Sequence, residues 1–332
     1  MSAKGVKRIL AVLTAVVACA TLLPGLGAPA AAESSSPLVI GHRGAAGLRP
    51  ENTLAAFTAG CELGVDAVEL DVLASADDVL VVHHDFRLSP AIARTPAGDW
   101  IPKTSPPAIR ELTLAQLKSY DIGRLQPGTA YVGRLPEQVA VDGERIPTFA
   151  ETIDTFKRAC GASTRLFVEI KTTPDEPGLT PAPEVLSERV VQAVRAAGIA
   201  GRTWILSFDW RNLDYVKKIA PELERVYLTI TGSGMDTLQP GRPGASPWLA
   251  GIDVDDSAGS APRAVKAAGG RVWSPFYRNL TAESLAEARR LGLLVSVWTV
   301  DGPEDLKRMI DLKVDAITTN RPDVLLKILA GQ

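Results

Sequence analysis

The amino-acid sequence predicts an α/β fold, a (β/α)8 TIM barrel. Short runs rich in β-branched residues alternate with amphipathic helical patterns from Pro37 to the C-terminus. Alternation of this kind is typical of a parallel sheet with crossover helices. It continues over about 250 residues or more, a length at which a closed barrel is the commonest form of a single α/β domain.

Composition limits the class of protein. The chain has 332 residues, 46% of them apolar and 22% charged, with 28 Gly, 24 Pro and 3 Cys. These values are those of an ordinary globular protein and exclude disordered, collagen-like and disulfide-dense chains. Lys and Arg total 36 against 38 Asp and Glu. Without an overall basic field, a nucleic-acid partner is not expected.

The first element, residues 1–32, has the pattern of a secretory signal peptide. Lys4, Lys7 and Arg8 precede an apolar run over Ile9–Leu23, and a segment of small residues follows it and ends in Ala30-Ala31-Ala32. An apolar run of 15 residues is shorter than the roughly 20 needed to span a bilayer. We therefore expect cleavage after Ala32 and a secreted, periplasmic or extracellular protein without stable membrane insertion.

An alternative for this segment is lipid anchoring at Cys19, but the apolar stretch that would then follow Cys19 argues against it. Removing the three basic residues of the leader leaves 33 basic and 38 acidic residues in a mature chain of 300, with a formal charge of −5. No pattern in the sequence decides the oligomeric state.

Two cysteines, Cys61 and Cys160, remain in the mature chain, each near the C-terminal end of a predicted helix. An oxidising compartment permits a disulfide between them. The sequence does not give the separation of their Cα atoms, so the disulfide is left open.

The strands follow in order along residues 37–330, which we expect to form the barrel domain. The predicted strands are Leu38–Gly41, Ala67–Val72, Val79–His83, Leu166–Ile170, Trp204–Phe208, Arg225–Thr229, Gly251–Val254, Arg271–Ser274, Val295–Val300 and Ala316–Thr318. These exceed the eight positions of a barrel. We expect Val79–His83 to pair back on Ala67–Val72 through a turn at Asp77-Asp78, and Gly251–Val254 to be peripheral or to share a position with a neighbour. A helix is predicted over Thr53–Leu63, where apolar residues recur at helical spacing and Gly64 ends it.

Residues 86–145 interrupt the alternation. The segment is rich in Pro and Gly and has one short helical pattern, Leu112–Tyr120, capped by Thr113 or a neighbour. A connection of this length inside a compact domain is usually functional. We interpret it as an insertion beside the mouth of the barrel.

Acidic side chains lie inside apolar strands. Glu69 and Asp71 are two residues apart and so share one face of a strand. Two facing carboxylates repel unless one is protonated or a cation lies between them. Glu169 places a third carboxylate in another strand. Oxygen ligands without cysteine favour Ca²⁺ or Mg²⁺ over Zn²⁺.

Basic side chains accompany the acids. Arg43 ends the first strand, and Lys171 shares a strand face with Glu169, so both could meet a phosphate oxygen. The chain has only three histidines, His42, His83 and His84. Two histidines beside a metal and two cations would suit acid–base hydrolysis of a phosphodiester. Strand alternation turns His83 away from His84, which predicts a structural role for His83.

Three aromatic residues are candidates for the wall of a pocket. Trp298, Phe208 and Trp273 could line the organic part of a substrate site. We expect at least one of them to pack in the core instead.

In combination these segments resemble the glycerophosphodiester phosphodiesterase family, from Ile40 to about Asp323. The motifs that carry the resemblance are His42-Arg43-Gly44, Glu51-Asn52-Thr53, the run from Gly64 to Val72, Val81-Val82-His83-His84-Asp85, Ile146-Pro147-Thr148, Val168-Glu169-Ile170-Lys171, Ser207-Phe208, Val297-Trp298-Thr299-Val300 and the run from Asp315 to Thr319. The resemblance implies a TIM barrel with an insertion after the second strand. It also implies a metal-dependent hydrolase that cleaves glycerophosphodiesters to glycerol 3-phosphate and an alcohol.

The same resemblance implies roles for individual residues. The divalent cation would be held by Glu69, Asp71 and Glu169. His42 and His84 would be the acid–base pair, with Arg43 and Lys171 at the phosphate.

The chain departs from the family pattern at three places. The hairpin turn has Asp77-Asp78 where the family usually has Asp-Gly. Asn320 stands where the family has Asp, and Asp301 stands where it has Asn. The last two departures bear on substrate preference more than on catalysis.

Two other functions stay open beside the diesterase. One is a phospholipase D-like activity on lysolipids or sphingomyelin, although the strand with Glu169 and Lys171 favours the soluble diester. The other is a non-catalytic phosphate-ester or lipid-binding protein. The sequence does not decide which head group the substrate carries or whether the ion is Ca²⁺ or Mg²⁺. It also does not decide which histidine is the acid and which the base, or whether water or a substrate hydroxyl attacks.

Overall fold

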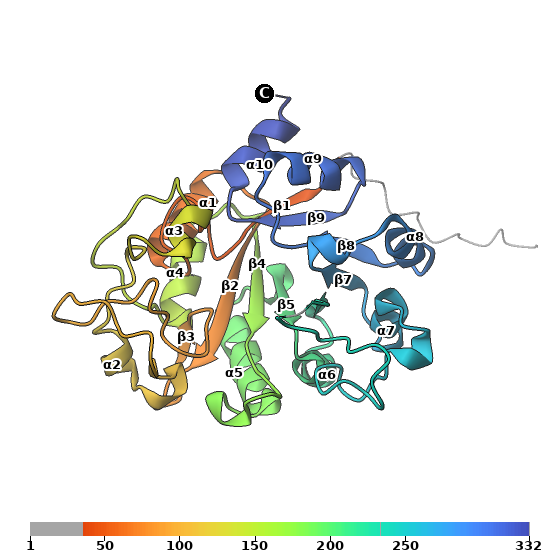
Figure 1. Ribbon diagram of the computed structural model, residues 1–332, viewed down its shortest axis with the longest axis horizontal. Coiled ribbons are helices and arrows are strands. Elements are labelled where there is room, and N and C mark those ends of the chain that lie inside the picture. Colours follow the sequence, from red (N-terminus) through yellow and green to blue (C-terminus); the bar gives the residue numbers. More distant parts are fainter. Residues whose placement is uncertain (1–35, 233, 332) are drawn as a thin grey trace, which may run out of the picture. The chain divides into compact units, whose positions relative to one another are not determined.

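Eight parallel strands close a barrel in the computed structural model, which describes residues 36–232 and 234–331 (Figure 1). The barrel strands are β1 (Leu38–Gly41), β2 (Ala67–Ala74), β4 (Arg165–Ile170), β5 (Thr203–Ser207), β6 (Glu224–Thr229), β7 (Val272–Pro275), β8 (Leu294–Val297) and β9 (Ala316–Thr319). Strand β1 pairs with β9 on one side and with β2 on the other, which completes the ring. The predicted (β/α)8 barrel is confirmed. The expected signal peptide, residues 1–32, and Cys19 lie outside the described residues.

Helices follow the strands and lie outside the barrel (Figure 1). Threonines begin several of them: Thr53 Oγ1 accepts from the N–H of Ala56, and Thr148 forms a capping box with Glu151. In the described part of the chain no helix has the length and apolar character needed to cross a membrane. The outer helices are α1 (Leu54–Glu62), α4 (Phe149–Ala159), α5 (Pro183–Ala196), α6 (Trp210–Ile219), α7 (Ala261–Ala267), α8 (Ala282–Arg290), α9 (Pro303–Asp311) and α10 (Pro322–Leu329), with 3₁₀ turns at Pro177–Leu179, Ala200–Arg202, Asp255–Ser257 and Tyr277–Asn279.

Strand alternation divides the core into two layers. In β1, Ile40 points into the barrel, whereas Val39 packs under the helices. The interior is filled by the side chains of Ile40, Ala67, Phe167, Leu206, Val226, Leu228, Val272 and Ala316. Apolar side chains fill this interior. The polar residues on the same strand faces therefore lie toward the carboxyl ends of the strands.

The hairpin expected after the second strand is present. Strand β3 (Leu80–Val82) pairs antiparallel with β2. The turn has Asp78 in the left-handed region at φ 63°. Asp77 accepts a hydrogen bond from the N–H of Leu114 at 2.9 Å, so the turn is tied to the insertion.

The expected strand Gly251–Val254 is wrong, because the structure has a loop there. Ala250 and Gly251 both have positive φ, 54° and 85°, which breaks an extended chain. Asp253 then accepts a hydrogen bond from the N–H of Asp255 at 2.9 Å, and a 3₁₀ turn follows over Asp255–Ser257. The β-branched residues of this run therefore lie in a loop and not in a strand.

The insertion, residues 86–145, has its own small apolar core. It contains a 3₁₀ turn (Ile109–Glu111), α2 (Leu114–Leu117) with the predicted cap Thr113, and α3 (Ala130–Arg134), which the sequence did not predict. The core joins two residues of the hairpin to residues of the insertion and the segment after it: Leu73, Val81, Leu88, Ala93, Ile101, Ile109, Leu117, Ile122 and Ile146. The insertion is thus anchored on β2 and β3.

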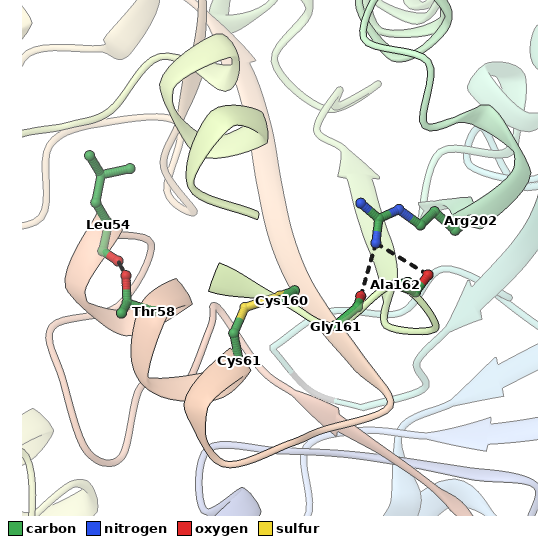
Figure 2. The surroundings of a disulfide bond; sticks show 7 residues. All are labelled: Leu54, Thr58, Cys61, Cys160, Gly161, Ala162 and Arg202. Carbon is green, nitrogen blue, oxygen red and sulfur yellow. Dashed lines mark hydrogen bonds between the residues drawn. A yellow bond between two sulfur atoms is a disulfide. The ribbon is translucent and has the colours of Figure 1, made fainter. Parts of the chain in front are cut away.

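Cys61 and Cys160 form a disulfide, with their Cα atoms 4.6 Å apart (Figure 2). The bond joins the last turn of α1 to the residue that ends α4. Arg202 donates to the carbonyl of Gly161 at 3.0 Å and holds the chain just after this bond. The bond that the sequence left open is therefore made, across a separation of 99 residues.

Removing this disulfide should lower stability without altering the barrel. A disulfide typically stabilises a protein by about 2–4 kcal/mol, so replacing Cys61 and Cys160 by Ser should lower the melting temperature by several degrees. Calorimetry of both proteins with and without reductant measures this. Reductant should lower the melting temperature of the wild type alone; equal melting temperatures for the oxidised wild type and the double variant would contradict the prediction.

Candidate active site

Three carboxylates meet at the carboxyl end of the barrel strands. Asp71 of β2 lies beside Glu169 of β4 in the strand register, and Glu69 lies two residues before Asp71 on the same face. All three are buried, and each offers an oxygen such that these atoms lie within 4.8 Å of one another. The structure therefore brings together the three residues expected to bind a metal.

These carboxylates cannot all be ionised at low cost. Burial raises the pKa of Glu69 well above its usual value, and the charges of Asp71 and Glu169 raise it further. Burial also raises the pKa of Glu169 to about 7, although the neighbouring Lys171 opposes the change. Buried oxygen donors that repel one another fit a hard divalent cation, which would compensate their charge. The cluster could therefore hold a metal ion.

Lys171 lies against the same cluster. Its Nζ is 2.9 Å from Oε1 of Glu169 and 3.5 Å from Oδ1 of Asp71. Burial alone would raise the pKa of Asp71, but the charges of His84, Lys171 and Arg43 lower it far below its usual value. Asp71 is thus the carboxylate that stays ionised most readily.

Arg43 contacts the cluster through its backbone and its side chain. Its N–H donates to Oε2 of Glu69 at 2.8 Å, and its Nη1 donates to Oε1 of Glu51 at 2.8 Å and to the hydroxyl of Tyr131 at 3.3 Å. Its Nε lies 3.6 Å from Oδ2 of Asp71 and has no hydrogen-bond partner among the described residues. One buried donor of Arg43 is therefore free to meet a ligand.

The tight turn after β1 requires glycine. Gly44 has φ 87°, and a Cβ on it would lie 2.5 Å from the carbonyl carbon of Ala56 in α1. The N–H of Gly44 donates to the carbonyl of Glu69 at 3.0 Å. This turn thus brings His42 and Arg43 against Glu69 of β2.

Asn52 supports the cluster from the loop before α1. Its Nδ2 donates to Oδ2 of Asp71 at 2.9 Å, and its Oδ1 accepts from the N–H of Asp71 at 3.4 Å. The sequence showed the motif Glu51-Asn52-Thr53 without giving Glu51 or Asn52 a role. Glu51 orients Arg43, Asn52 orients Asp71, and Thr53 caps α1.

Two histidines, His42 and His84, lie beside the cluster. The Nε2 of His42 lies 3.9 Å from Oε2 of Glu69, and its Nδ1 lies 2.7 Å from Oδ1 of Asn320. The Nδ1 of His84 lies 2.7 Å from Oδ1 of Asp85. Burial and the charge of Arg43 lower the pKa of His42 to about 3 and that of His84 to about 4. Both rings are thus held through Nδ1.

His83 lies apart from this pair. It is buried, with 2% of its surface exposed, and its Nε2 has no hydrogen-bond partner among the described residues. It lines none of the three hollows that His84 lines. This placement agrees with the structural role that strand alternation suggested.

Two large hollows meet at Arg43 and His84. One, of about 640 Å³, is lined mainly by charged and polar residues, among them Lys103, Gln126, Tyr131 and Arg134 of the insertion. The other, of about 560 Å³, is apolar, with Phe86, Phe208, Met235, Trp248 and Trp298 in its wall. A ligand centred on the carboxylates could therefore extend in two directions of different polarity.

The three candidate aromatic residues divide between pocket and core. Phe208 and Trp298 pack edge to face, with ring centroids 5.1 Å apart, beside the cluster. Trp273 is 2% exposed and donates through Nε1 to Oγ1 of Thr229 at 2.9 Å. Trp273 is thus the one that belongs to the core.

Tyr131 and Asn320 are two further site residues that sequence reasoning missed. Tyr131 comes from α3, a five-residue helix with no apolar periodicity to reveal it. Asn320 stood out only as a departure from a family pattern, yet it contacts His42. Its place directly after the last strand was the available signal, because the carboxyl ends of all the barrel strands meet.

Comparisons with known proteins agree on one family. The model of the glycerophosphoryl diester phosphodiesterase family matches residues 42–324. A glycerophosphodiester phosphodiesterase of Caldanaerobacter subterraneus subsp. tengcongensis is 30% identical, over 88% of this chain and 97% of the relative. One of Bacillus subtilis is 26% identical, over 89% and 87%. The crystal structure of a glycerophosphoryl diester phosphodiesterase homologue from Silicibacter pomeroyi has a TM-score of 0.78 at 34% identity, over 89% of this chain and 94% of that chain.

A divalent cation should stabilise the protein through the carboxylate cluster. Ca²⁺ or Mg²⁺ at about 100 times its dissociation constant would raise the free energy of unfolding by about 2.7 kcal/mol. The Glu69→Gln variant should lose this gain. In the presence of a chelator at neutral pH, the Glu69→Gln variant should be at least as stable as the wild type. The substitution removes a carboxylate whose ionised form is disfavoured by folding. Thermal unfolding measures both effects.

The matched control is the Glu62→Gln variant, because Glu62 is exposed. This variant should keep the full stabilisation by the cation. A cation response that survives in Glu69→Gln would show that the ion binds elsewhere.

Proposed function

The chain belongs to the glycerophosphoryl diester phosphodiesterase family of enzymes, and from this premise we propose that it hydrolyses glycerophosphodiesters to glycerol 3-phosphate and an alcohol. One observation carries the proposal: two histidines, three carboxylates and two basic side chains converge at the carboxyl end of the barrel. Small diesters would enter where the polar and apolar hollows meet.

The proposed metal ligands are Glu69, Asp71 and Glu169, and the ion is Ca²⁺ or Mg²⁺. Their donor set supports this, because it consists of oxygen atoms only. A divalent cation bound there supplies Lewis-acid polarisation of the phosphoryl group. Asn52 keeps one oxygen of Asp71 occupied by a hydrogen bond and so fixes the plane of that carboxylate.

Arg43 and Lys171 are proposed to bind the phosphoryl oxygens. The Nε–H of Arg43 is a buried donor without a hydrogen-bond partner among the described residues, and a phosphoryl oxygen would satisfy it. Lys171 is buried beside Glu169 and keeps donors beyond that contact. Fixed donors in a buried site stabilise charge that develops on the phosphoryl oxygens.

His42 and His84 are proposed to move the protons. Each ring is held through Nδ1, by Asn320 and by Asp85, so each presents Nε2 to the site. One Nε2 removes the proton of the attacking hydroxyl, and the other gives a proton to the leaving alcohol. Trp298 and Phe208 would pack against the organic part of the substrate.

Export is part of the same proposal. The pattern of residues 1–32 supports a cleaved signal peptide, and the disulfide between Cys61 and Cys160 suits an oxidising compartment. We propose that the mature enzyme begins at Glu33 and acts outside the cytoplasm.

A coupled assay of glycerol 3-phosphate released from glycerophosphocholine tests the activity. EDTA should abolish release, and added Ca²⁺ or Mg²⁺ should restore it. His42→Ala should lower kcat by about 100-fold or more, because it removes one partner of the proton transfer. His83→Gln is the matched control and should keep the activity of the folded protein.

Two results would overturn this proposal. One is activity that neither EDTA nor His42→Ala changes. The other is choline release from sphingomyelin that exceeds release of glycerol 3-phosphate, which would favour the phospholipase D-like alternative.

Export is tested by the N-terminus of the secreted protein. N-terminal sequencing of protein from the culture medium or periplasm should begin at Glu33. Ala32→Arg should block processing, because the cleavage site needs a small residue there. A protein that keeps residues 1–32, or one that begins at a lipid-modified Cys19, would contradict the prediction.

A further inference from the structure

Two residues at the rim of the barrel, Asp301 and Asn320, hold one another. Asp301 follows β8, and Asn320 directly follows β9. Asp301 Oδ1 accepts from the backbone N–H of Asn320 at 2.8 Å and from the hydroxyl of Thr319 at 3.2 Å. Its Oδ2 accepts from Nδ2 of Asn320 at 2.8 Å. The carboxylate thus fixes both the backbone and the side chain of Asn320.

This contact decides which way the amide of Asn320 faces. An ionised carboxylate can only accept hydrogen bonds, so the NH₂ group of Asn320 must face Asp301. The amide oxygen then faces the other way, toward Nδ1 of His42 at 2.7 Å. An amide oxygen can only accept, so the hydrogen atom of that bond belongs to Nδ1 of His42.

We propose that Asp301 is a positioning residue for the reaction: through Asn320 it holds His42 as the tautomer with hydrogen on Nδ1, so that the lone pair of Nε2 faces the phosphate site. The proposal rests on the function proposed above. In the resting enzyme His42 is then ready to accept a proton. The hydrogen bond made by one ring nitrogen sets the state of the other.

The two histidines of the site are held in different ways. His84 meets the carboxylate of Asp85 directly, whereas His42 meets a neutral amide, with the carboxylate of Asp301 one residue further away. At Nδ1, the neutral amide thus orients the ring of His42 without a carboxylate in direct contact.

The network could keep its hydrogen bonds if Asp301 and Asn320 were exchanged. The two side chains are bonded to one another, and either order lets an oxygen accept from His42 and an amide donate to a carboxylate.

Kinetics of the exchange variants test the proposal. Asp301→Asn frees the amide of Asn320 to turn, and Asn320→Asp places two carboxylates together. Each should lower kcat for glycerophosphocholine by about tenfold or more, with KM changed by about twofold or less, because the change affects proton transfer rather than binding. The double variant Asp301→Asn/Asn320→Asp restores the network and should recover kcat to within about threefold.

The matched control is Asp323→Asn, which removes an ion pair with Arg321 in the same segment and should leave kcat unchanged. Single variants that keep the wild-type kcat, or a double variant whose losses simply add, would overturn the proposal. Melting temperatures of all the variants separate a loss of folding from a loss of kcat.

Imidazole ¹⁵N spectra of the full chain give a readout that does not depend on activity. The chain has only three histidines, and His42→Ala identifies the signals of His42. We expect hydrogen on Nδ1 in the wild type and in the double variant, and a mixture of tautomers in Asp301→Asn. Hydrogen on Nε2 of His42 in the wild type would overturn the proposal. If the wild type releases no glycerol 3-phosphate, the proposed function fails, and the spectrum still decides the tautomer.

Discussion

The burial of three carboxylates at one end of the barrel is the constraint on which the site depends. At an effective dielectric constant of about 20, two unit charges 4 Å apart interact by about 4 kcal/mol, and a whole domain is stable by only about 5–15 kcal/mol. The negative charges of Glu69, Asp71 and Glu169 therefore need nearby positive charges or hydrogen-bond donors. Lys171 and Arg43 give part of it, and Asn52 gives Asp71 a hydrogen bond. This balance also explains why basic and amide side chains crowd the carboxylates.

Much of this arrangement follows from strand periodicity. Residues two apart share a strand face, which was enough to put Glu69 with Asp71 and Glu169 with Lys171. The barrel followed from alternation of strands and helices, and its strands begin and end within a few residues of the predicted limits. Local pattern thus determines the strands, and the closed barrel brings their ends together.

What the sequence did not show depends on tertiary packing. The run Gly251–Val254 has the composition of a strand, but two residues with positive φ make it a loop. Tyr131 reaches Arg43 only because the insertion packs on β2 and β3. His42 and Asn320 are 278 positions apart, and their contact exists only because β1 pairs with β9. Such contacts have no periodic signal in the chain.

The position of the disulfide has a consequence for proteolysis. The loop that it closes, from Cys61 to Cys160, contains β2, β3 and the whole insertion. Exposed loops of an insertion are where proteases cut first. A single cut within residues 86–145 would leave two polypeptides that are still joined covalently, with the segment that carries Glu69 and Asp71 tied to the rest of the barrel. The two parts of a nicked molecule of this kind could separate only after reduction of the disulfide.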